Sequence, residues 1–427
     1  MFCQLEILRH CLPSSVRDIL EELPESLDET YERILREIRK PNQEHAHRLL
    51  QSLVAAVRPL RVKELAEVLA VDFTEGMPRL NLDWRWEDQE EAVMSACSSL
   101  VIIVKEGDSS IVQFSHFSVK EFLMAKRLAE RIKDVSHYHI QLETAHTILA
   151  QACLGVLLRL DDNVNRDNIE DFPLARYASQ YWSTHARAES VSSRIEDGVK
   201  CLFDKDRPHF ATWLWIYNED SQGRSISTQH PEVPDAGPLY YASMLGFRNL
   251  AKHLIAKRPR DVNDRGGGKV TPLHVAVSAG HLDILSLLLD HGANVDGRDR
   301  LGQTPLHRAS SNGKVEVGQC LLDRGANIKA RDNDRWTPLF HAAFQGHLEF
   351  TRMLIERGAE IDARDTIGTT PLHRVVQTDH FRVVQLLLER GADVNARSES
   401  GKIPSELAWL PKIVELLSEH NAKPEES

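Results

Sequence analysis

Residues 271–303 read TPLHVAVSAGHLDILSLLLDHGANVDGRDRLGQ, and this stretch decides the fold of the C-terminal half. Its first four letters recur at Thr304 (TPLH), Thr337 (TPLF) and Thr370 (TPLH), each 33 residues after the last. A fixed period of this size is typical of a supersecondary unit that cannot bury its own apolar face and therefore stacks on copies of itself. The sequence thus predicts a repeat array from about residue 238 onward.

One unit can be interpreted in physical terms as two short helices and a protruding finger. Pro272 suits the first position of a helix, and Gly280 ends that helix. A second helix is expected over residues 282–290, because its leucines and isoleucine recur at helical spacing, and Gly292 supplies the left-handed residue that stops it. Residues 293–302 then form the finger that leads into the next unit.

The TPLH motif, the mid-repeat Gly-His and the Gly-Ala-Asn/Asp-Val/Ile run together resemble the ankyrin repeat. The resemblance covers units that start near residues 238, 271, 304, 337 and 370, with a shorter and more polar cap from 403. Asp379 replaces the Gly of Gly-His in one unit, and Arg335 replaces the Gly of one finger. Both positions are expected to need a left-handed or tight backbone, so each replacement should cost on the order of 1 kcal/mol.

The resemblance implies a contact surface on the fingers and the concave helix face. The finger tips are Arg300, Leu301, Asn333, Asp334, Thr366, Ile367, Glu399 and Ser400, with Trp336 just behind the second tip. The residue after each TPLH or TPLF is Val275, Arg308, His341 or Arg374, and Phe344 and Gln345 follow one helical turn later. An Arg-His-Arg column beside an exposed Phe344 would suit an acidic or aromatic peptide. The alternative is that these are solvated surface positions.

Composition limits the class of protein. The chain has 427 residues, is 42% hydrophobic and has no apolar run of 18 or more, which is typical of a soluble chain of about three domains without membrane insertion. The N-terminal MFCQLEILRHCLPSS has no long apolar core and is predicted to be a helix, not a signal peptide. Six scattered cysteines without a CxxC pair, and histidines without HExxH, indicate reduced thiols, no metal site and a cytoplasmic location.

Charge is divided unevenly along the chain. Residues 238–427 hold 25 Lys and Arg against 24 Asp and Glu, whereas the first 237 residues hold 27 against 39. The array is therefore nearly neutral and the N-terminal half is strongly acidic. This balance opposes nonspecific binding of nucleic acid.

Residues 41–133 have the pattern of a winged helix. Helices are expected over 44–57, 63–71 and 90–98, strands over 100–105 and 111–116, and a last helix from Ser118, which forms a capping box with Glu121. Leu49, Leu50, Leu53, Val54 and Val57 are the predicted core of the first helix. A DNA-binding winged helix would place its third helix in the major groove. Here that helix begins Glu-Asp-Gln-Glu-Glu, which phosphates would repel, so no nucleic acid is expected.

A second resemblance lies in the same region. LPESLDETYERIL (23–35), RPLRVKELAEVLAVD (58–72), CSSLV (97–101) and VQFSHFSVKEFL (112–123) are similar to the segment after the NTPase core in fungal NACHT (STAND-type) ankyrin-repeat proteins, and inositol-deacylase-like relatives share that winged helix. The resemblance implies that residues 1–40 are the helical tail of a missing NACHT-type module, with Ser26 and Glu29 capping its last helix. The NTPase core itself is expected to be absent.

His116 falls where NACHT winged helices place a histidine against the ADP phosphate, so the resemblance makes it a weak candidate for nucleotide-phosphate sensing. The alternative is that His116 ends a strand and satisfies a neighbouring carbonyl. GGGKVT (266–271) is not a phosphate loop, because Asn263 stands at the first glycine position and Val270 follows Lys269. We interpret it as an extended first finger.

Residues 134–225 are predicted to be a helical connector, and 226–237 a linker. Five aromatic residues in the connector could form either a ligand cage or, as we expect, helix packing: Tyr177, Tyr181, Trp182, Trp213 and Trp215. The whole chain is thus predicted to be mainly α, with a winged helix and connector followed by an ankyrin solenoid over 238–427.

No catalytic arrangement is evident, and the TPLH histidines are best explained as hydrogen-bonding members of the repeat turn. We therefore expect a non-enzymatic interaction module without cofactors, in which the ankyrin face captures a protein ligand as the sensor or scaffold of a NACHT-like signalling protein. The alternative is a nucleotide-dependent switch that works with an NTPase module not present in this chain.

Overall fold

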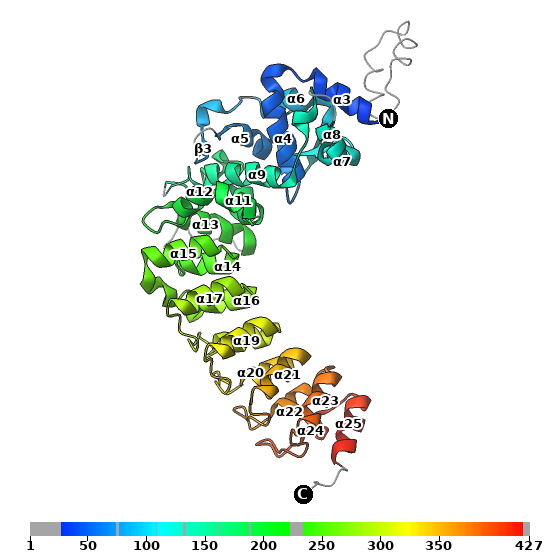
Figure 1. Cartoon of the computed structure of the whole chain (residues 1–427), viewed down its shortest axis with the longest axis vertical. Coiled ribbons are helices and arrows are strands. Elements are labelled where there is room, and N and C mark those ends of the chain that lie inside the picture. The colour runs from blue at the N-terminus through cyan, green and yellow to red at the C-terminus, as the bar shows by residue number, and fades with distance from the viewer. Residues whose placement is uncertain are drawn as a thin grey trace. The chain divides into compact units, whose positions relative to one another are not determined.

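The computed structural model describes residues 27–73, 77–107, 109–130, 134–161, 163–187, 189–222 and 234–421. The chain forms two compact units, the first ending at Pro234 and the second starting at Asp235 (Figure 1). The predicted N-terminal helix, the cap at Ser26 and most of the predicted linker lie outside the described residues. Among those that are described, no helix is both long enough and apolar enough to cross a bilayer.

The first unit begins with the winged helix. Its helices are α3 (Leu27–Glu37), α4 (Gln43–Ala55), α5 (Val62–Leu69), α6 (Gln89–Cys97), α7 (Phe117–Met124) and α8 (Lys126–Glu130). The first three predicted helices are therefore present, with ends shifted by one or two residues. Leu49, Leu50 and Val54 are buried as expected. Val57 is 50% exposed, because α4 ends at Ala55 and leaves this side chain on the following turn.

The wing is an antiparallel hairpin of β4 (Val101–Glu106) and β5 (Ser109–Phe114). A short strand, β1 (Leu60–Arg61), pairs with the other edge of β5, so the sheet order is β1-β5-β4. Two further short strands, β2 (Val71–Asp72) and β3 (Arg79–Leu80), form a separate pair. The predicted hairpin is confirmed, and the two extra pairings were too short to be detected from alternation.

The start of α7 differs from the expected capping box. Ser118 lies inside the helix, and the residue that caps it is His116, whose Nδ1 accepts a hydrogen bond from the backbone N–H of Ser118 at 3.3 Å. The Ser118 hydroxyl lies 2.6 Å from the same nitrogen and 2.8 Å from the hydroxyl of Tyr31 on α3. Because Tyr31 is buried and its ring lies 5.4 Å from that of Phe122, α3 packs directly on α7.

The connector is helical and packs on the winged helix through α9. Its helices are α9 (Leu142–Leu157), α10 (Ala175–Ala186), α11 (Glu189–Arg194), α12 (Glu196–Leu202) and α13 (His209–Gln222). Trp182 and Trp213 are almost fully buried, with ring centroids 5.9 Å apart and nearly perpendicular planes. The indole of Trp213 donates to the carbonyl of Ser179 at 3.0 Å. The expectation of helix packing in place of a ligand cage is confirmed for these residues.

The second unit is a stack of helix pairs, which follow one another from α14 to α25 in Figure 1. The pairs are α14 (Pro238–Leu245) with α15 (Arg248–Lys257), α16 (Pro272–Ala279) with α17 (Leu282–Asp290), α18 (Pro305–Asn312) with α19 (Val315–Asp323), α20 (Pro338–Phe344) with α21 (Leu348–Glu356), α22 (Pro371–Val375) with α23 (Phe381–Glu389), and α24 (Pro404–Leu407) with α25 (Pro411–Asn421). Each first helix begins at the proline of its repeat. The helices expected over 272–279 and 282–290 are confirmed.

Left-handed glycines end the helices as predicted, and one has a second role. Gly280 and Gly292 have φ of 88° and 85°. At Gly313, with φ of 65°, an added Cβ would also lie 2.6 Å from the ring of His347 in the next repeat. Since His347 Nε2 in turn lies 2.9 Å from the carbonyl of Ser311, the glycine makes room for a hydrogen bond between repeats.

The two residues that stand in place of glycine differ in backbone conformation. Arg335 adopts a left-handed conformation with φ of 63°, as expected. Asp379 does not, so of the two predicted conformations only the tight backbone is found there. In its repeat α22 stops at Val375, and the chain continues in tight turns in which the N–H of Thr378 bonds to the carbonyl of Val375 at 3.0 Å. This tighter ending reaches α23 without a left-handed residue.

The TPLH histidines are hydrogen-bonded as predicted. In each, Nδ1 faces the threonine that begins the repeat, and Nε2 lies near a carbonyl at the end of the next finger, 3.0 Å away for His307 and Trp336. Burial, together with the neighbouring His341, lowers the pKa of His307 to about 4. The ring is therefore neutral at pH 7 and ties the start of its repeat to the finger that ends the same repeat.

Candidate protein-binding surface

Three fingers of the array are each shaped by one buried aspartate. One oxygen of Asp299 accepts hydrogen bonds from the backbone N–H groups of Leu301 and Gln303, at 2.8 and 2.9 Å. Asp332 and Asp365 repeat the arrangement 33 and 66 residues further along the chain. An aspartate side chain that mimics a backbone turn in this way fixes the path of the finger.

The second oxygen of each aspartate binds the residue after TPLH or TPLF. Arg308 reaches Asp299 at 2.6 Å, His341 reaches Asp332 at 2.9 Å, and Arg374 reaches Asp365 at 3.0 Å. The predicted Arg-His-Arg column therefore exists, but its members are tied to the fingers. His341 is buried, and the arginine side chains are 33% and 28% exposed. The column holds the fingers against the helices and is not a row of free cations.

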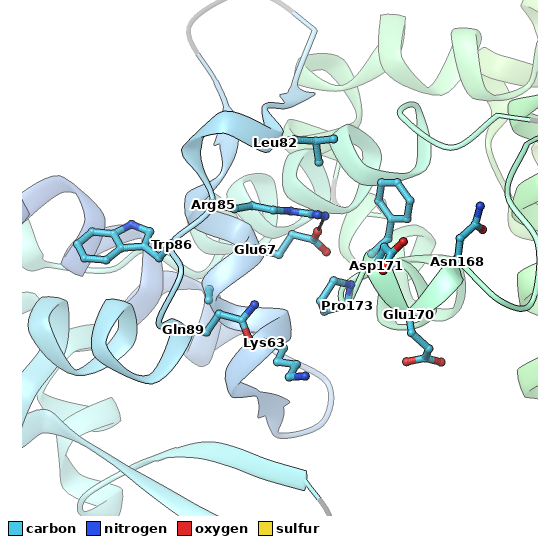
Figure 2. Close-up of a pocket in the computed structure, with 12 residues that line it drawn as sticks. Lys63, Glu67, Leu82, Arg85, Trp86, Gln89, Asn168, Glu170, Asp171 and Pro173 are labelled. Carbon is cyan, nitrogen blue, oxygen red and sulfur yellow. Dashed lines mark hydrogen bonds and ion pairs between the residues drawn. The ribbon is translucent and has the colours of Figure 1, made fainter.

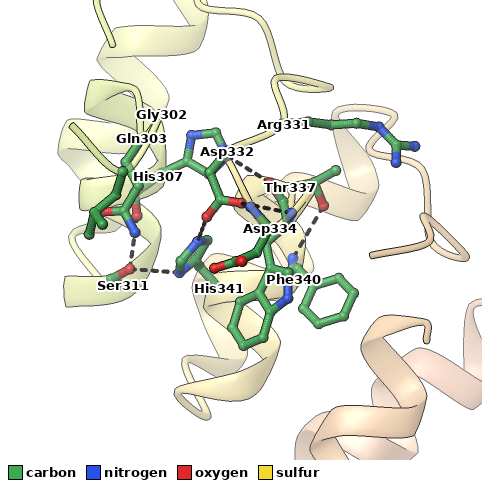
Figure 3. Close-up of polar contacts among 12 residues, drawn as sticks. Gly302, Gln303, His307, Ser311, Arg331, Asp332, Asp334, Thr337, Phe340 and His341 are labelled. Carbon is green, nitrogen blue, oxygen red and sulfur yellow. Dashed lines mark hydrogen bonds and ion pairs between the residues drawn. The ribbon is translucent and has the colours of Figure 1, made fainter. Parts of the chain in front are cut away.

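In two of these pairs hydrogen bonds favour the ionised carboxylate. Burial opposes ionisation of Asp332, but hydrogen bonds from His341 and from the backbone N–H of Trp336 outweigh it and hold the pKa of Asp332 below its usual value. Burial acts in the same way at Asp365, where hydrogen bonds from Thr369 and Arg374 lower the pKa. Figure 3 shows His341 between Ser311 and Asp332, where it joins two repeats.

An aromatic patch lies on the same face, beside this network. The ring of Trp336 stacks on that of Phe340 at 4.6 Å and meets the edge of Phe344 at 5.4 Å. The guanidinium carbon of Arg374 lies 5.8 Å from the centre of the Trp336 ring, within reach of a cation–π interaction. Phe340 is buried, whereas Trp336 and Phe344 are half-buried, so Phe344 is less accessible than predicted. Gln345 is exposed.

The finger tips are exposed and joined by backbone hydrogen bonds. The N–H of Asn333 donates to the carbonyl of Leu301 at 3.0 Å, and that of Thr366 donates to the carbonyl of Asp334 at 3.1 Å. All the predicted tip residues are exposed: Arg300, Leu301, Asn333, Asp334, Thr366, Ile367, Glu399 and Ser400. Leu301 and Ile367 are 58% and 50% exposed, so two apolar tips flank the polar tip at Asp334.

The glycine-rich segment before the second repeat belongs to the first finger. Gly268 and Lys269 both have positive φ, of 69° and 60°. The carbonyl of Gly268 accepts a hydrogen bond from the N–H of Arg300 at 2.7 Å. In the next finger the carbonyl of Leu301 takes the same position and accepts from the N–H of Asn333. The segment thus continues the row of fingers, and it does not connect a strand to a long helix as a phosphate loop would.

His116, the weak candidate for phosphate sensing, lies on the first unit. It is exposed, and its ring lies 4.3 Å from that of Phe117, which is 71% exposed. Because Nδ1 accepts from the backbone N–H of Ser118, the ring carries its proton on Nε2 when neutral. The geometry shows a helix cap; phosphate sensing stays a prediction.

Several described residues that shape the surface were not predicted from the sequence. Asp299, Asp332 and Asp365 each precede their arginine or histidine partner by nine residues. That spacing recurs with the 33-residue period, so a search for charge pairs in register with the repeat would have found them. Phe340 stands where the three TPLH repeats have His, and its ring supports Trp336.

Comparison with known proteins bears on both units. Residues 239–332 and 327–398 match the family of ankyrin repeats (3 copies). Residues 31–133 match the winged helix domain of GPI inositol-deacylase. The second match includes much of α3, in agreement with its packing on α7.

Individual relatives share parts of the chain. The azaphilone pigments biosynthesis cluster protein L of Monascus ruber is 35% identical over 293 residues, which make up 65% of this chain and 61% of that protein. Ankyrin repeat domain-containing protein 49 of Bos taurus is 39% identical over 91 residues, 19% of this chain and 38% of that protein. The chain thus spans about three fifths of the Monascus protein and less of the other. It carries ankyrin repeats, which imply protein partners, and a winged helix domain of the GPI inositol-deacylase type.

Proposed function

We propose that the second unit binds a protein ligand on the patch formed by Trp336, Phe344, Arg308 and Arg374, with the finger tips Arg300, Leu301, Asn333, Asp334 and Ile367 at its edge. The observation that carries this proposal is the half-buried Trp336 ring, which lies between two phenylalanines and an arginine. Tryptophan and arginine are enriched among the residues that dominate protein interfaces. The ankyrin repeats support an interaction role, and the aromatic patch favours this part of their surface.

The patch favours an anchor of particular chemistry. An aromatic or aliphatic side chain can cover the exposed parts of Trp336 and Phe344. Arg308 and Arg374 each bind their aspartate through a single terminal nitrogen, Nη2. The other terminal nitrogen makes no hydrogen bond with a described residue, so each arginine can also bind a carboxylate. A ligand with an apolar side chain next to an acidic one fits this arrangement.

The patch is stiff before it binds. His341, Arg308 and Arg374 are held by buried aspartates, and these aspartates also fix the finger backbone. Fewer degrees of freedom are then lost on association, which favours affinity. The network therefore supports binding even though its cations are already paired.

Affinity capture from a cell extract tests the proposal with matched variants. Trp336→Ala should remove the proteins that the wild-type chain retains through this patch, and Arg374→Glu should do the same by repelling acidic ligands. Trp409→Ala is the control, since Trp409 is 68% exposed and lies in the cap of the same array. Retention of the same proteins by Trp336→Ala and the wild-type chain would contradict the proposal.

We propose that this binding unit serves a NACHT-type signalling protein, in which the winged helix works with an NTPase module. The order of winged helix and ankyrin repeats in the chain supports this, as does the position of His116. In its neutral form His116 has an Nε2–H that makes no hydrogen bond with a described residue and can donate to a phosphate. Two thermal-shift measurements with ADP test the second point, one on the wild-type chain and one on His116→Ala. A rise in Tm that the variant lacks would support it, and no rise in either would leave His116 only as a helix cap.

A further inference from the structure

An apolar surface on the first unit is separate from the ankyrin patch. The loop between β3 and α6 exposes three large side chains at alternate positions: Leu82 is 38% exposed, Trp84 47% and Trp86 43%. Neither indole makes a ring contact with another described aromatic residue. Trp182 and Trp213 of the same unit are instead buried. Exposed tryptophans gathered on one loop are typical of an interaction site.

The loop borders a cavity of about 590 Å³ (Figure 2). One wall is formed by Leu82, Trp86 and Gln89, and the other by Asn168 and residues 170–173, which precede α10. Figure 2 shows Trp86 and Asp171 on opposite sides of Arg85 and Glu67. Because the apolar side chains of Leu82, Trp86, Phe172 and Pro173 share this cavity, it can accept a side chain from a partner.

The floor of the cavity is rigid and internally neutral. Arg85 forms an ion pair with Glu67, which also accepts a hydrogen bond from the backbone N–H of Leu174 at 2.7 Å. The guanidinium of Arg85 lies 5.4 Å from the centre of the Phe172 ring. Burial raises the pKa of Glu67, and the Leu174 N–H and Arg85 counteract it. The floor therefore determines the shape of the cavity, whereas selectivity for the charge of a ligand depends on the rim.

The rim is acidic. Residues 82–91 contain five carboxylates and one cation, Arg85, which is already paired. Asp88 caps α6, since its side chain accepts from the N–H of Glu91 at 3.0 Å. The exposed carboxylates of Asp83, Glu87, Glu90 and Glu91 form no ion pair with a described residue. Stabilisation of the α6 N-terminus accounts for acidic residues in its first turn, but it accounts neither for Asp83 nor for the two exposed indoles.

We propose that this groove, the tryptophan groove, binds a basic segment of a partner protein in which apolar residues alternate with Lys or Arg. An apolar side chain enters the cavity against Trp86, Leu82 and Phe172. The flanking cations lie over the exposed indole faces and pair with the carboxylates of Asp83 and Glu87, so that cation–π and ionic attraction act together. Charge complementarity selects this occupant, because an acidic segment would be repelled by the same rim.

Fluorescence anisotropy with the full chain tests the proposal. The probe is a labelled peptide of alternating lysine and leucine, and the matched probe has glutamate in place of every lysine. The lysine peptide should bind saturably, and its affinity should fall as salt is added, since the rim charges are exposed. Equal binding of the two peptides would overturn the proposal.

Variants locate the binding. Trp86→Ala should weaken the lysine peptide about tenfold or more, as expected for an interface anchor. The double change Asp83→Asn with Glu87→Gln keeps both indoles and should flatten the salt dependence. The controls are Trp409→Ala, an exposed tryptophan of the second unit, and Glu121→Gln, an exposed carboxylate elsewhere on the winged helix. Trp86→Phe keeps a ring in the wall and should retain most of the affinity if the loss in Trp86→Ala is local.

Two other outcomes would overturn the proposal in favour of another occupant. Self-association of the chain that Trp86→Ala abolishes, without peptide binding, would assign the groove to a second copy. Binding to neutral phosphatidylcholine vesicles that depends on Trp84 and Trp86, again without peptide binding, would assign it to a lipid surface.

Discussion

The two units of the chain differ in the polar contacts that stabilise each of them internally. In the ankyrin array many polar contacts recur with the repeat, as in the Asp299–Arg308 and Asp365–Arg374 pairs. In the first unit several buried or half-buried polar contacts do not recur and join distant parts of the sequence. The bond between Glu67 and the N–H of Leu174 spans 107 residues and ties the winged helix to the connector. Loss of one contact should therefore have a small, local effect in the array and a large, global effect in the first unit.

The largest effect is expected from Glu67→Ala. This change leaves Arg85 without its partner and the N–H of Leu174 buried without an acceptor. Removing one member of a buried ion pair typically costs roughly 3–5 kcal/mol of unfolding free energy. Urea denaturation, followed by the fluorescence of the buried tryptophans of the first unit, measures the loss. Glu90→Ala, at an exposed carboxylate close in sequence, should change the free energy by less than about 0.5 kcal/mol, and comparable losses in the two variants would contradict the comparison.

The array should lose stability in mild acid because of its histidines. The folded-state pKa of His307 is lowered to about 4, below that of the unfolded chain, so the unfolded state binds the proton first as the pH falls. This difference in pKa contributes on the order of 3 kcal/mol to the free energy of unfolding. The contribution is complete above about pH 6.5 and is lost between there and about pH 4. The measurement is Tm against pH for the wild-type chain and for His307→Gln. The Tm of the variant should fall less steeply with pH over this window. Identical slopes of Tm against pH would rule out His307 as a source of the acid sensitivity.

Glycine substitutions separate backbone strain from contacts between repeats. Gly313 and Gly358 both have positive φ, of 65° and 87°. An added Cβ would meet the His347 ring at Gly313 but nothing within 4 Å at Gly358. Gly358→Ala should therefore cost about 1 kcal/mol, and Gly313→Ala about 2 kcal/mol. Hydrogen exchange of the repeats on either side reports the difference, and equal costs would mean that the His347 contact contributes nothing.

The smallest effect separates the two natural replacements of glycine. Arg335→Gly should stabilise the array by about 1 kcal/mol, because it relieves a left-handed arginine. Asp379→Gly should give no gain, since Asp379 does not have a positive φ, and should slightly destabilise the folded state by adding freedom to the unfolded chain. Urea denaturation of the two variants compares them. A gain in stability for Asp379→Gly and none for Arg335→Gly would contradict the assignment of backbone strain to Arg335.

The same contrast explains what could be predicted from the sequence. The repeat period places every helix of the array to within a few residues, because each unit depends on local signals such as Pro272 and Gly280. The pairing of Asp299 with Arg308 also has a signal in the sequence, because the spacing of nine residues between the two recurs with the repeat. The bond from Glu67 to Leu174 leaves no such signal, because it joins a side chain to a backbone group in another helical layer and occurs once.

The role of His116 shows a second limit. The resemblance to NACHT winged helices predicts that His116 lies near a phosphate. The usual preference for serine at a helix start predicts that Ser118 is the cap. In the structure the imidazole itself caps α7, since the extended backbone at His116 directs Nδ1 toward the N–H of Ser118. Capping by histidine is not among the strong preferences from which helix starts are predicted.

The central claim is that the ankyrin unit binds its protein ligand through the patch around Trp336. Hydrogen exchange of the full chain, with and without a captured ligand, tests it most directly. Bound ligand should slow exchange at the backbone amides of residues 333–345 and at the tips around Leu301 and Ile367, while the outer helices α17, α19 and α21 keep their rates. Protection confined to the outer helices, or to the first unit alone, would contradict the claim.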